Sequence, residues 1–328
     1  MTNAGADDGT SPSNPPIRIG ISACLLGEAV RYDGGHKRDP FLTGVLAEYV
    51  EWVSVCPELE IGLGVPRETI QLERKNDLIR LVGTRSGTDH TNAMKRWSRR
   101  RLAELTKEDL CGYVLKKNSP SCGMERVRVY DENGVPSRTG RGLFAEALLE
   151  RFGSLPVEEE GRLQDAKLRE NFIERVFAYR RLRNLFAERW TAGQVVAFHT
   201  AHKLLLMAHS PSAYRSLGKL VAAVKKTDRK EFRAEYERQF MEGMKAIATR
   251  GRHTNVLQHM LGYLRGHLDK ASTEELAGLV EDYRQGLVPL VVPLTLIRHY
   301  VRLLGIEYLQ GQAYLEPHPK ELMLRNHV

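Results

Sequence analysis

Apolar residues between positions 17 and 160 occur in short continuous runs that are separated by segments of helical spacing. The runs that favour buried strands occupy residues 17–22, 52–55 and 112–115, and shorter strands are indicated near 70–72, 78–82 and 127–130. Helices are indicated at about 41–50, 91–105 and 142–151. Strands that alternate with helices predict an α/β domain, built on a mainly parallel sheet with flanking helices.

Beyond residue 160 the pattern changes to helical periodicity, without a convincing strand. Helices are expected near residues 162–189, 193–208, 211–223, 229–249, 254–268, 273–286 and 292–304. The stretch from 152 to 160 combines Gly, Pro and three Glu, which is typical of a joint between domains. We therefore expect an α/β N-terminal domain at 17–155 and an all-α C-terminal domain at 161–328, preceded by a disordered polar tail at 1–16.

Three of the four cysteines follow a predicted strand or its exit loop. They are Cys24, Cys56 and Cys122, and the last lies in a loop that Pro120 and Gly123 shape. Ligand sites in open α/β sheets lie beyond the carboxyl ends of the strands, so these thiols are expected to meet although they are 32 and 66 residues apart in sequence. Three thiolates can hold a [4Fe–4S] cluster with one open iron, or a zinc ion with one exchangeable position.

Charge is distributed unevenly along the chain. Residues 1–160 hold 22 Lys and Arg against 24 Asp and Glu, whereas residues 161–328 hold 27 against 17. A basic C-terminal half suggests contact with a polyanion, and a solvated basic surface is the alternative. The sequence has no apolar run of about 18 residues and no apolar signal region, and four cysteines do not make a disulfide framework. We therefore expect a cytoplasmic protein that makes no contact with membrane.

Five separated motifs in the first half resemble the thiouracil desulfidase family, formerly a domain of unknown function. They are ISACLLG at 21–27, RYDG at 31–34, VCPE at 55–58, VPR at 65–67 and KKNSPSCG at 116–123. The resemblance covers about residues 17–155. It implies that Cys24, Cys56 and Cys122 hold a [4Fe–4S] cluster with one open iron, and that sulfur is removed from thiolated uracil to leave the oxo base and sulfide. It also implies that Glu58 and Ser119 are catalytic.

The chemistry of the motif residues agrees with this resemblance. A soft thiocarbonyl sulfur suits an open iron, which then acts as a Lewis acid without redox change. Glu58 is expected to activate the attacking water, and Ser119 to hydrogen-bond the base or the departing sulfur. The alternative is that Glu58 caps a helix and the serines satisfy the loop backbone. Cys111 belongs to no motif and is expected to be a buried, inert thiol. Further candidates for contact with the substrate are Ser121, Asp33, His36 and Arg67.

From about residue 175 the chain resembles a second family, a helical domain often fused behind the first. The matching segments are YRRL at 179–182, FHTAHKLLLMAHS at 198–210 and LVVPLTLI at 290–297. Fused members resemble tRNA 4-thiouridine desulfidases, which implies tRNA as a partner and no obligate protein partner. The helix around 198–210 has no Asp or Glu at ligand spacing, so packed or RNA-contacting histidines are preferred to a metal site. Candidate tRNA-contacting residues are Arg180, Arg181, His199, His202 and Lys203.

The sequence and its resemblances together predict a [4Fe–4S]-dependent desulfidase that hydrolyses 4-thiouridine in tRNA to uridine and sulfide without redox change. One alternative is a desulfidase of free thiouracil or thiouridine, in which the helical half serves only for assembly. A second is a non-catalytic iron–sulfur or zinc regulator that binds nucleic acid. Turnover of tRNA compared with the free base would separate the first two, and nucleic-acid affinity without sulfide release would indicate the third.

Overall fold

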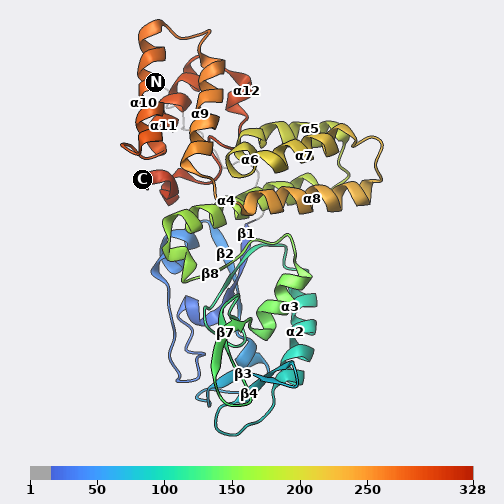
Figure 1. The fold of residues 1–328 in the computed structure, drawn as a ribbon. Helices are drawn as coiled ribbons and strands as arrows, with labels where there is room; N and C mark the ends of the chain where they lie inside the picture. Colours follow the sequence, from blue (N-terminus) through green and yellow to red (C-terminus); the bar gives the residue numbers. More distant parts are fainter. Residues whose placement is uncertain (1–15, 328) are drawn as a thin grey trace, which may run out of the picture.

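A computed structural model describes residues 16–327 of the chain (Figure 1). The expected disordered tail at 1–16 lies outside the described residues, apart from Pro16. A sheet-containing part extends to residue 159, and the described residues beyond it form helices, turns and loops. The predicted α/β domain followed by an all-α region is therefore confirmed. Between residues 16 and 327, no helix is both long and apolar enough to cross a membrane.

The main sheet is parallel throughout. Its strands lie in the order β2 (Val50–Val55), β1 (Ile17–Ser22), β5 (Leu110–Leu115) and β8 (Val157–Glu159). All six residues of β5 are buried, which explains the continuous apolar run there. Strand β8 lies beyond the domain boundary that was expected at residue 155. It could not be predicted, because a strand of three residues inside the Glu-rich stretch shows no recognisable alternation of apolar and polar residues. The sheet thus continues into the stretch that was interpreted as a joint.

A second, smaller sheet has mixed strand directions. Its order is β4 (Leu78–Gly83), β3 (Ile70–Lys75), β6 (Val127–Tyr130) and β7 (Pro136–Gly140), with only the β3–β6 pair parallel. It lies at the end of the molecule away from the helical half (Figure 1). The helix expected at 41–50 is instead two short turns, Phe41–Val45 and Leu46–Glu48, because β2 already begins at Val50.

Helices pack on both faces of the main sheet. On one face lie α2 (Thr91–Leu105) and α3 (Leu143–Arg151), where the rings of Trp97 and Phe144 are 5.3 Å apart. On the other face lies α4 (Ala166–Leu185), and Gly112 of β5 lets Val176 approach: a Cβ at that glycine would be 2.8 Å from the valine. Because α4 also packs against α8, it joins the two halves of the molecule.

The remaining helices form two groups around α4 (Figure 1). The first is an arm on one side, made of α5 (Ala192–Ala201), α6 (Lys203–His209), α7 (Pro211–Ala222) and α8 (Arg229–Lys245). The second contains α9 (Arg250–Leu264), α10 (Lys270–Gln285), α11 (Val291–Leu303) and α12 (Glu307–Gln310). The helix expected at 193–208 is divided at His202 into α5 and α6. Buried apolar side chains of the sheet and of these helices form one continuous core.

Candidate functional site

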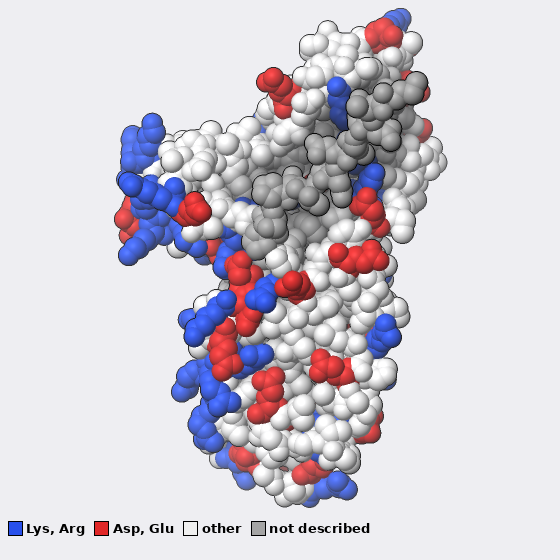
Figure 2. Space-filling model, turned by 180° about the vertical axis from the view of Figure 1, so that it is seen from behind, with Lys and Arg blue, Asp and Glu red and all other residues white. Residues whose placement is uncertain are grey.

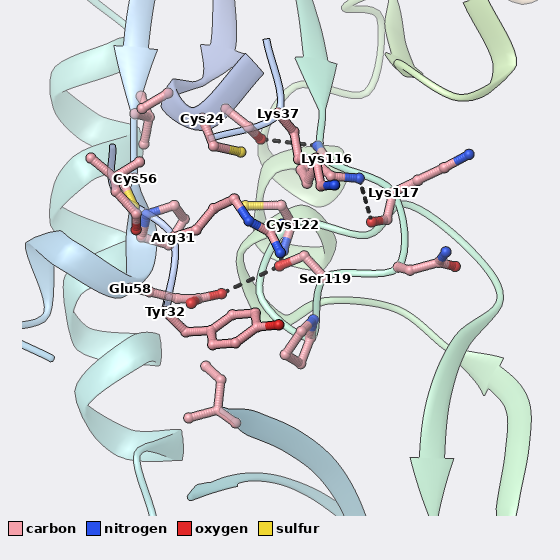
Figure 3. Close-up of a pocket in the computed structure, with 18 of the residues that line it drawn as sticks. Cys24, Arg31, Tyr32, Lys37, Cys56, Glu58, Lys116, Lys117, Ser119 and Cys122 are labelled. Atoms are coloured by element: carbon pink, nitrogen blue, oxygen red, sulfur yellow. Dashed lines mark hydrogen bonds between the residues drawn. The ribbon is translucent and has the colours of Figure 1, made fainter. Parts of the chain in front are cut away.

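Three cysteines line one cavity at the carboxyl edge of the main sheet. Cys24 follows β1, Cys56 lies between β2 and the short helix α1 (Pro57–Glu60), and Cys122 lies in the loop after β5. The cavity has a volume of about 330 Å³, and Figure 3 shows the three sulfur atoms facing it. The convergence expected from the strand ends is therefore present in the structure. Cys111 is fully buried within β5 and lies outside this cavity, as expected of a packing residue.

Burial raises the pKa of all three cavity thiols. The pKa of Cys24 is raised to about 11, mainly because the thiol is desolvated, while Lys116 and Arg31 act in the opposite direction. Desolvation also raises the pKa of Cys56, and that of Cys122 well above its ordinary value. The thiols are therefore protonated at neutral pH in the metal-free protein, and metal binding must displace their protons.

The loop that carries Cys122 is held by hydrogen bonds to Ser119. The Oγ atom of Ser119 accepts the backbone N–H groups of Ser121 (3.2 Å) and Cys122 (3.1 Å), and its carbonyl accepts that of Gly123 (2.8 Å). A Cβ at Gly123 would lie 2.3 Å from a methyl group of Val127, so only glycine fits there. The serine does satisfy the loop backbone, as the alternative interpretation proposed, and it also faces the cavity.

Glu58 is held at both of its carboxylate oxygens. Oε2 accepts from Arg67 Nη2 at 2.6 Å and Nε at 3.2 Å. Oε1 accepts from Ser121 Oγ at 3.1 Å and, more weakly, from Ser119 Oγ at 3.4 Å (Figure 3). Glu58 does not cap α1, because the backbone N–H of Cys56 is bound by Glu60 Oε1 instead (3.1 Å). The carboxylate is therefore free of a capping role and is oriented beside the thiols.

Arg67 orients Glu58 from a buried position. Its side chain is 6% exposed and also donates to the carbonyl oxygens of Val30 (3.0 Å) and Gly64 (2.9 Å). Four hydrogen bonds from one guanidinium thus connect two loops to the carboxylate of α1. Although Arg67 lines the cavity, its donors are occupied by protein atoms, so its role is to position Glu58.

Three predicted substrate-contacting residues do not line the cavity, namely Ser121, Asp33 and His36. Ser121 is fully buried behind Glu58. The Oδ1 atom of Asp33 accepts the backbone N–H of Gly35 (3.0 Å), and His36 Nδ1 accepts that of Arg38 (3.2 Å). Both side chains therefore stabilise the loop that passes beside the cavity, and their contact with the substrate stays a prediction.

Sequence reasoning missed several residues of the cavity wall, namely Arg31, Tyr32, Lys37, Lys116 and Lys117. It also missed Glu160, which binds Lys116 Nζ (2.5 Å) and the backbone N–H of Lys117 (2.7 Å). Lys116 and Lys117 are the first two residues of the motif at 116–123. Their place in the motif was the signal that could have indicated their position in the cavity wall. Glu160 follows β8, and nothing in the local pattern indicates that this strand belongs to the sheet.

The donor set of the cavity is compatible with an iron–sulfur cluster. The thiols of Cys24, Cys56 and Cys122 come from three separate strand ends around a shared cavity. A [4Fe–4S] cluster takes one thiolate at each of the irons that the protein binds, so its ligands can come from separate loops. Among residues 16–327, no group of three or more His, Cys, Asp or Glu side chains is placed to hold a single metal ion.

The residues predicted to contact tRNA are mostly committed to the protein interior. Arg180 is 5% exposed and forms an ion pair with Asp109 (2.7 Å), and Arg181 donates to the carbonyl oxygens of Glu316 (3.1 Å) and Pro317 (2.7 Å). His202 is 3% exposed, and burial lowers its pKa to about 4. Arg180 and His202 are thus buried in this structure, and their contact with RNA stays a prediction.

The other two predicted contacts, His199 and Lys203, are partly exposed. His199 Nδ1 lies 3.2 Å from the hydroxyl of Tyr236, and Lys203 Nζ lies 5.9 Å from the ring centres of both Tyr214 and Tyr308. These aromatic contacts place the two side chains against the arm and the neighbouring α12. Their contact with RNA stays a prediction.

Comparison with known proteins defines the class of this chain. Residues 19–160 match the family described as 2-thiouracil desulfurase, and residues 203–319 match a family described as a protein of unknown function, DUF1722. The uncharacterized protein YbgA of Escherichia coli K12 is 35% identical over 153 residues, which are 46% of this chain and 90% of the relative. The uncharacterized protein YbbK of Bacillus subtilis 168 is 32% identical over 148 residues, which are 42% and 93% of the two chains.

Among solved structures, the [4Fe-4S]-dependent thiouracil desulfidase TudS is similar, with 35% sequence identity and a TM-score of 0.37. The match covers 45% of this chain and 93% of TudS. From the family match and the relatives, the chain belongs to the 2-thiouracil desulfurase family, a family of desulfidase enzymes. Its second half carries the additional domain of unknown function.

Proposed function

We propose that the protein is a [4Fe–4S]-dependent desulfidase that hydrolyses 4-thiouridine in tRNA to uridine and sulfide. The observation that carries the proposal is the shared cavity, in which the thiols of Cys24, Cys56 and Cys122 lie around the oriented carboxylate of Glu58. The thiols would hold the cluster. When bound, the cluster supplies a Lewis-acidic iron that accepts the soft sulfur of a thiocarbonyl.

Glu58 is the general base of the proposed reaction. Arg67 holds Oε2, so Oε1 is the oxygen that takes a proton from water, on the side where Ser119 faces the cavity. The water oxygen forms a bond to the ring carbon while the bond from that carbon to sulfur breaks. The ring carbon becomes a carbonyl when the added hydroxyl loses the second proton of the water, and the sulfur leaves as hydrogen sulfide, which carries the equivalent of both protons. The reaction is therefore a hydrolysis that needs no oxidant or reductant.

Ser119 supports this step from the Cys122 loop. Because its oxygen already accepts two backbone N–H groups, its single hydroxyl proton is available for Glu58 Oε1 or for an oxygen or sulfur atom in the cavity. The Ser119 hydroxyl can therefore stay hydrogen-bonded to the attacking water while that water gives its proton to Glu58. The same residue thus fixes a cluster-binding loop and orients the attacking water.

Exposed basic residues support tRNA as the carrier of the thiolated base. Helix α2 exposes Lys95, Arg96, Arg99 and Arg100. The turn after α7 exposes Lys225 and Lys226, and the first turn of α8 exposes Lys230. Within the described part of the chain, none of the seven forms an ion pair. Figure 2 shows Lys and Arg gathered at the end of the arm and along the adjoining edge of the sheet-containing part, with acidic groups between them. Unpaired cations of this kind bind RNA phosphates.

Helix α2 connects this basic surface to the cavity. The short helix α1, which carries Glu58, packs against α2, and Arg101 of α2 pairs with Glu60 of α1 at 3.5 Å. An RNA strand on α2 would thus pass beside the wall that holds the general base. These surface residues replace the buried Arg180 and His202 as the candidates for tRNA contact. A base inside folded tRNA would still have to leave its stack to enter the cavity.

Anaerobic reconstitution followed by incubation with tRNA that contains 4-thiouridine tests the proposal. We expect cluster-dependent loss of the thiouridine absorbance together with release of an equal amount of sulfide. Free 4-thiouridine and 2-thiouracil serve as parallel substrates. Faster turnover of the free compounds than of tRNA would favour the alternative substrate class. A protein that holds its cluster, binds tRNA and releases no sulfide from any of them would contradict the desulfidase assignment.

A further inference from the structure

An exposed aromatic ring on a rigid turn lies beside the reactive groups of the cavity. The ring belongs to Tyr32, which lines the cavity and is 40% exposed. In the view of Figure 3, the Glu58–Ser119 pair lies between this ring and the Cys24 sulfur. Within residues 16–327, no aromatic side chain stacks on Tyr32. A tyrosine ring that is exposed, has no aromatic partner and faces a cavity is suited to contact a flat ligand.

The turn that carries Tyr32 is held at several backbone positions. The backbone N–H of Arg31 donates to the carbonyl of Gly35 (3.2 Å), and that of Gly34 donates to the carbonyl of Arg31 (3.0 Å). Gly34 has a φ of 75°, a left-handed conformation that glycine adopts without strain. The side chain of Asp33 accepts the N–H of Gly35 at 3.0 Å. These hydrogen bonds fix the backbone of the turn that carries Tyr32.

The same turn is connected to the general base. The carbonyl oxygen of Tyr32 accepts the backbone N–H of Arg67 (2.9 Å), and the side chain of Arg67 holds Glu58. The Arg31 guanidinium lies 5.2 Å from the centre of the Tyr32 ring and also pairs with Asp33 at 3.4 Å. The backbone of Tyr32 and the carboxylate of Glu58 are therefore connected through a single residue, Arg67, which suits a residue that positions a substrate for attack.

We propose that Tyr32 is the platform on which the pyrimidine ring of the substrate stacks during desulfuration. The identity of the pyrimidine rests on the proposed function, whereas the platform itself rests on the exposure and the anchoring of the ring. A base on Tyr32 turns its edge toward the cavity, where its thiocarbonyl meets the cysteine side and its ring carbon meets Glu58. Arg31 covers part of the tyrosine and favours the ring orientation by a cation–π contact.

Stacking on Tyr32 would allow the base to be recognised without contact to its sugar. Every pyrimidine has a π face, so the contact is available to a free thiobase and to a base extruded from RNA alike. For an extruded base the tyrosine replaces part of the stacking that is lost when it leaves its neighbours. We therefore place the selection between free base and tRNA on the outer basic surface, and the orientation of the base on Tyr32.

A series of substitutions at Tyr32 tests the platform. The variants Y32F and Y32W keep an aromatic ring, Y32L keeps apolar bulk without one, and Y32A removes both. We expect KM for free 4-thiouridine to stay within about threefold in Y32F and Y32W and to rise about tenfold in Y32L and Y32A. The Kd for unmodified uridine, measured by calorimetry on the cluster-loaded protein, should rank the variants in the same order. As a control, Y263A removes a similarly exposed tyrosine of α9 and should leave both constants unchanged.

The outcomes separate the platform from the proposed reaction. If Y32L had the same KM and Kd as Y32F, apolar bulk would be sufficient and the stacking proposal would be overturned. A Y32A variant with unchanged KM and Kd would overturn it as well. A protein that releases no sulfide from any thiolated substrate, yet binds uridine in the aromatic order, would remove the proposed function and support the platform. Because Tyr32 is exposed, each variant should unfold at the temperature of the parent protein.

Discussion

The guanidinium of Arg67 lies 2.6 Å from Glu58 Oε2, and its side chain is almost completely buried. The two residues are nine positions apart and come from different segments, α1 and the loop that precedes β3. Their contact leaves the second oxygen of Glu58 to the serines of the Cys122 loop. The pair therefore connects Glu58 to the Cys122 loop and explains how a helix of four residues holds a carboxylate in place.

Replacement of Arg67 by Lys should reduce turnover while the cluster stays bound. Lysine offers a single ammonium group, so the carboxylate of Glu58 is no longer held by two donors of one planar group. We expect kcat to fall by about 10- to 100-fold, since a misplaced base loses most of its advantage. Kinetics on 4-thiouridine and the visible absorbance of the cluster check this. Loss of the absorbance in R67K would mean instead that Arg67 acts on the cluster loops.

Replacement of Glu58 by Gln should remove turnover and preserve the rest of the site. Glutamine keeps the size of the side chain and can still bond to Ser121, but it cannot take a proton from water. General base catalysis contributes about 10²- to 10⁴-fold, and a loss in this range is expected at constant iron content. E60Q, at the neighbouring glutamate of α1, is the matched control. A fully active E58Q variant would eliminate the assignment of the base.

Substitution of the cysteines one at a time should divide them into two groups. Alanine at Cys24, Cys56 or Cys122 should abolish cluster binding and activity together, because each thiol supplies one ligand. Alanine at Cys111 should keep both, since this thiol packs within β5 and lies outside the cavity. Iron and sulfide content with sulfide release are the measurements. An inactive C111A protein that unfolds normally and lacks iron would contradict this division.

The cavity thiols make the stability of the metal-free protein depend on alkaline pH. The folded pKa of Cys24 is about 11, above its ordinary value of 9.0, so the unfolded chain loses this proton at lower pH than the folded one. Stability contributed by the protonated thiol is therefore complete below about pH 9 and is lost as the pH rises toward 11. Denaturant unfolding of the metal-free protein between these values should show the decline, and the C24A variant should show less of it.

Charge reversal on α2 should weaken binding of tRNA without changing the chemistry. The triple variant R96E/R99E/R100E replaces exposed cations that have no ion-pair partner in residues 16–327. We expect the Kd for tRNA to rise at least about tenfold and its dependence on salt to become shallower, since fewer counterions are released. Turnover of free 4-thiouridine should be unchanged. K270E, at an almost fully exposed lysine of α10, is the control. An equal loss on both substrates would argue against a separate RNA surface.

The chain pattern alone was sufficient for the fold class and for the meeting of the thiols at one edge of the sheet. Continuous apolar runs before Cys24, Cys56 and Cys122 predict buried strands, and parallel strands bring their carboxyl ends to one edge. Proximity of the thiols follows from those two facts without knowledge of any side-chain contact. The roles of Glu58 and Ser119 came from the family resemblance, and their geometry beside the thiols agrees with it.

The tertiary structure decided which polar side chains reach the cavity and which are buried. Arg180 belongs to α4, a helix rich in charged residues. Because α4 lies between the sheet and the arm, Arg180 is buried there and forms an ion pair with Asp109. Glu160 reaches Lys116 only because β8, a strand of three residues, pairs with β5. Such contacts join residues that are far apart in sequence, and local periodicity reports only which face of an element is apolar, not what covers it.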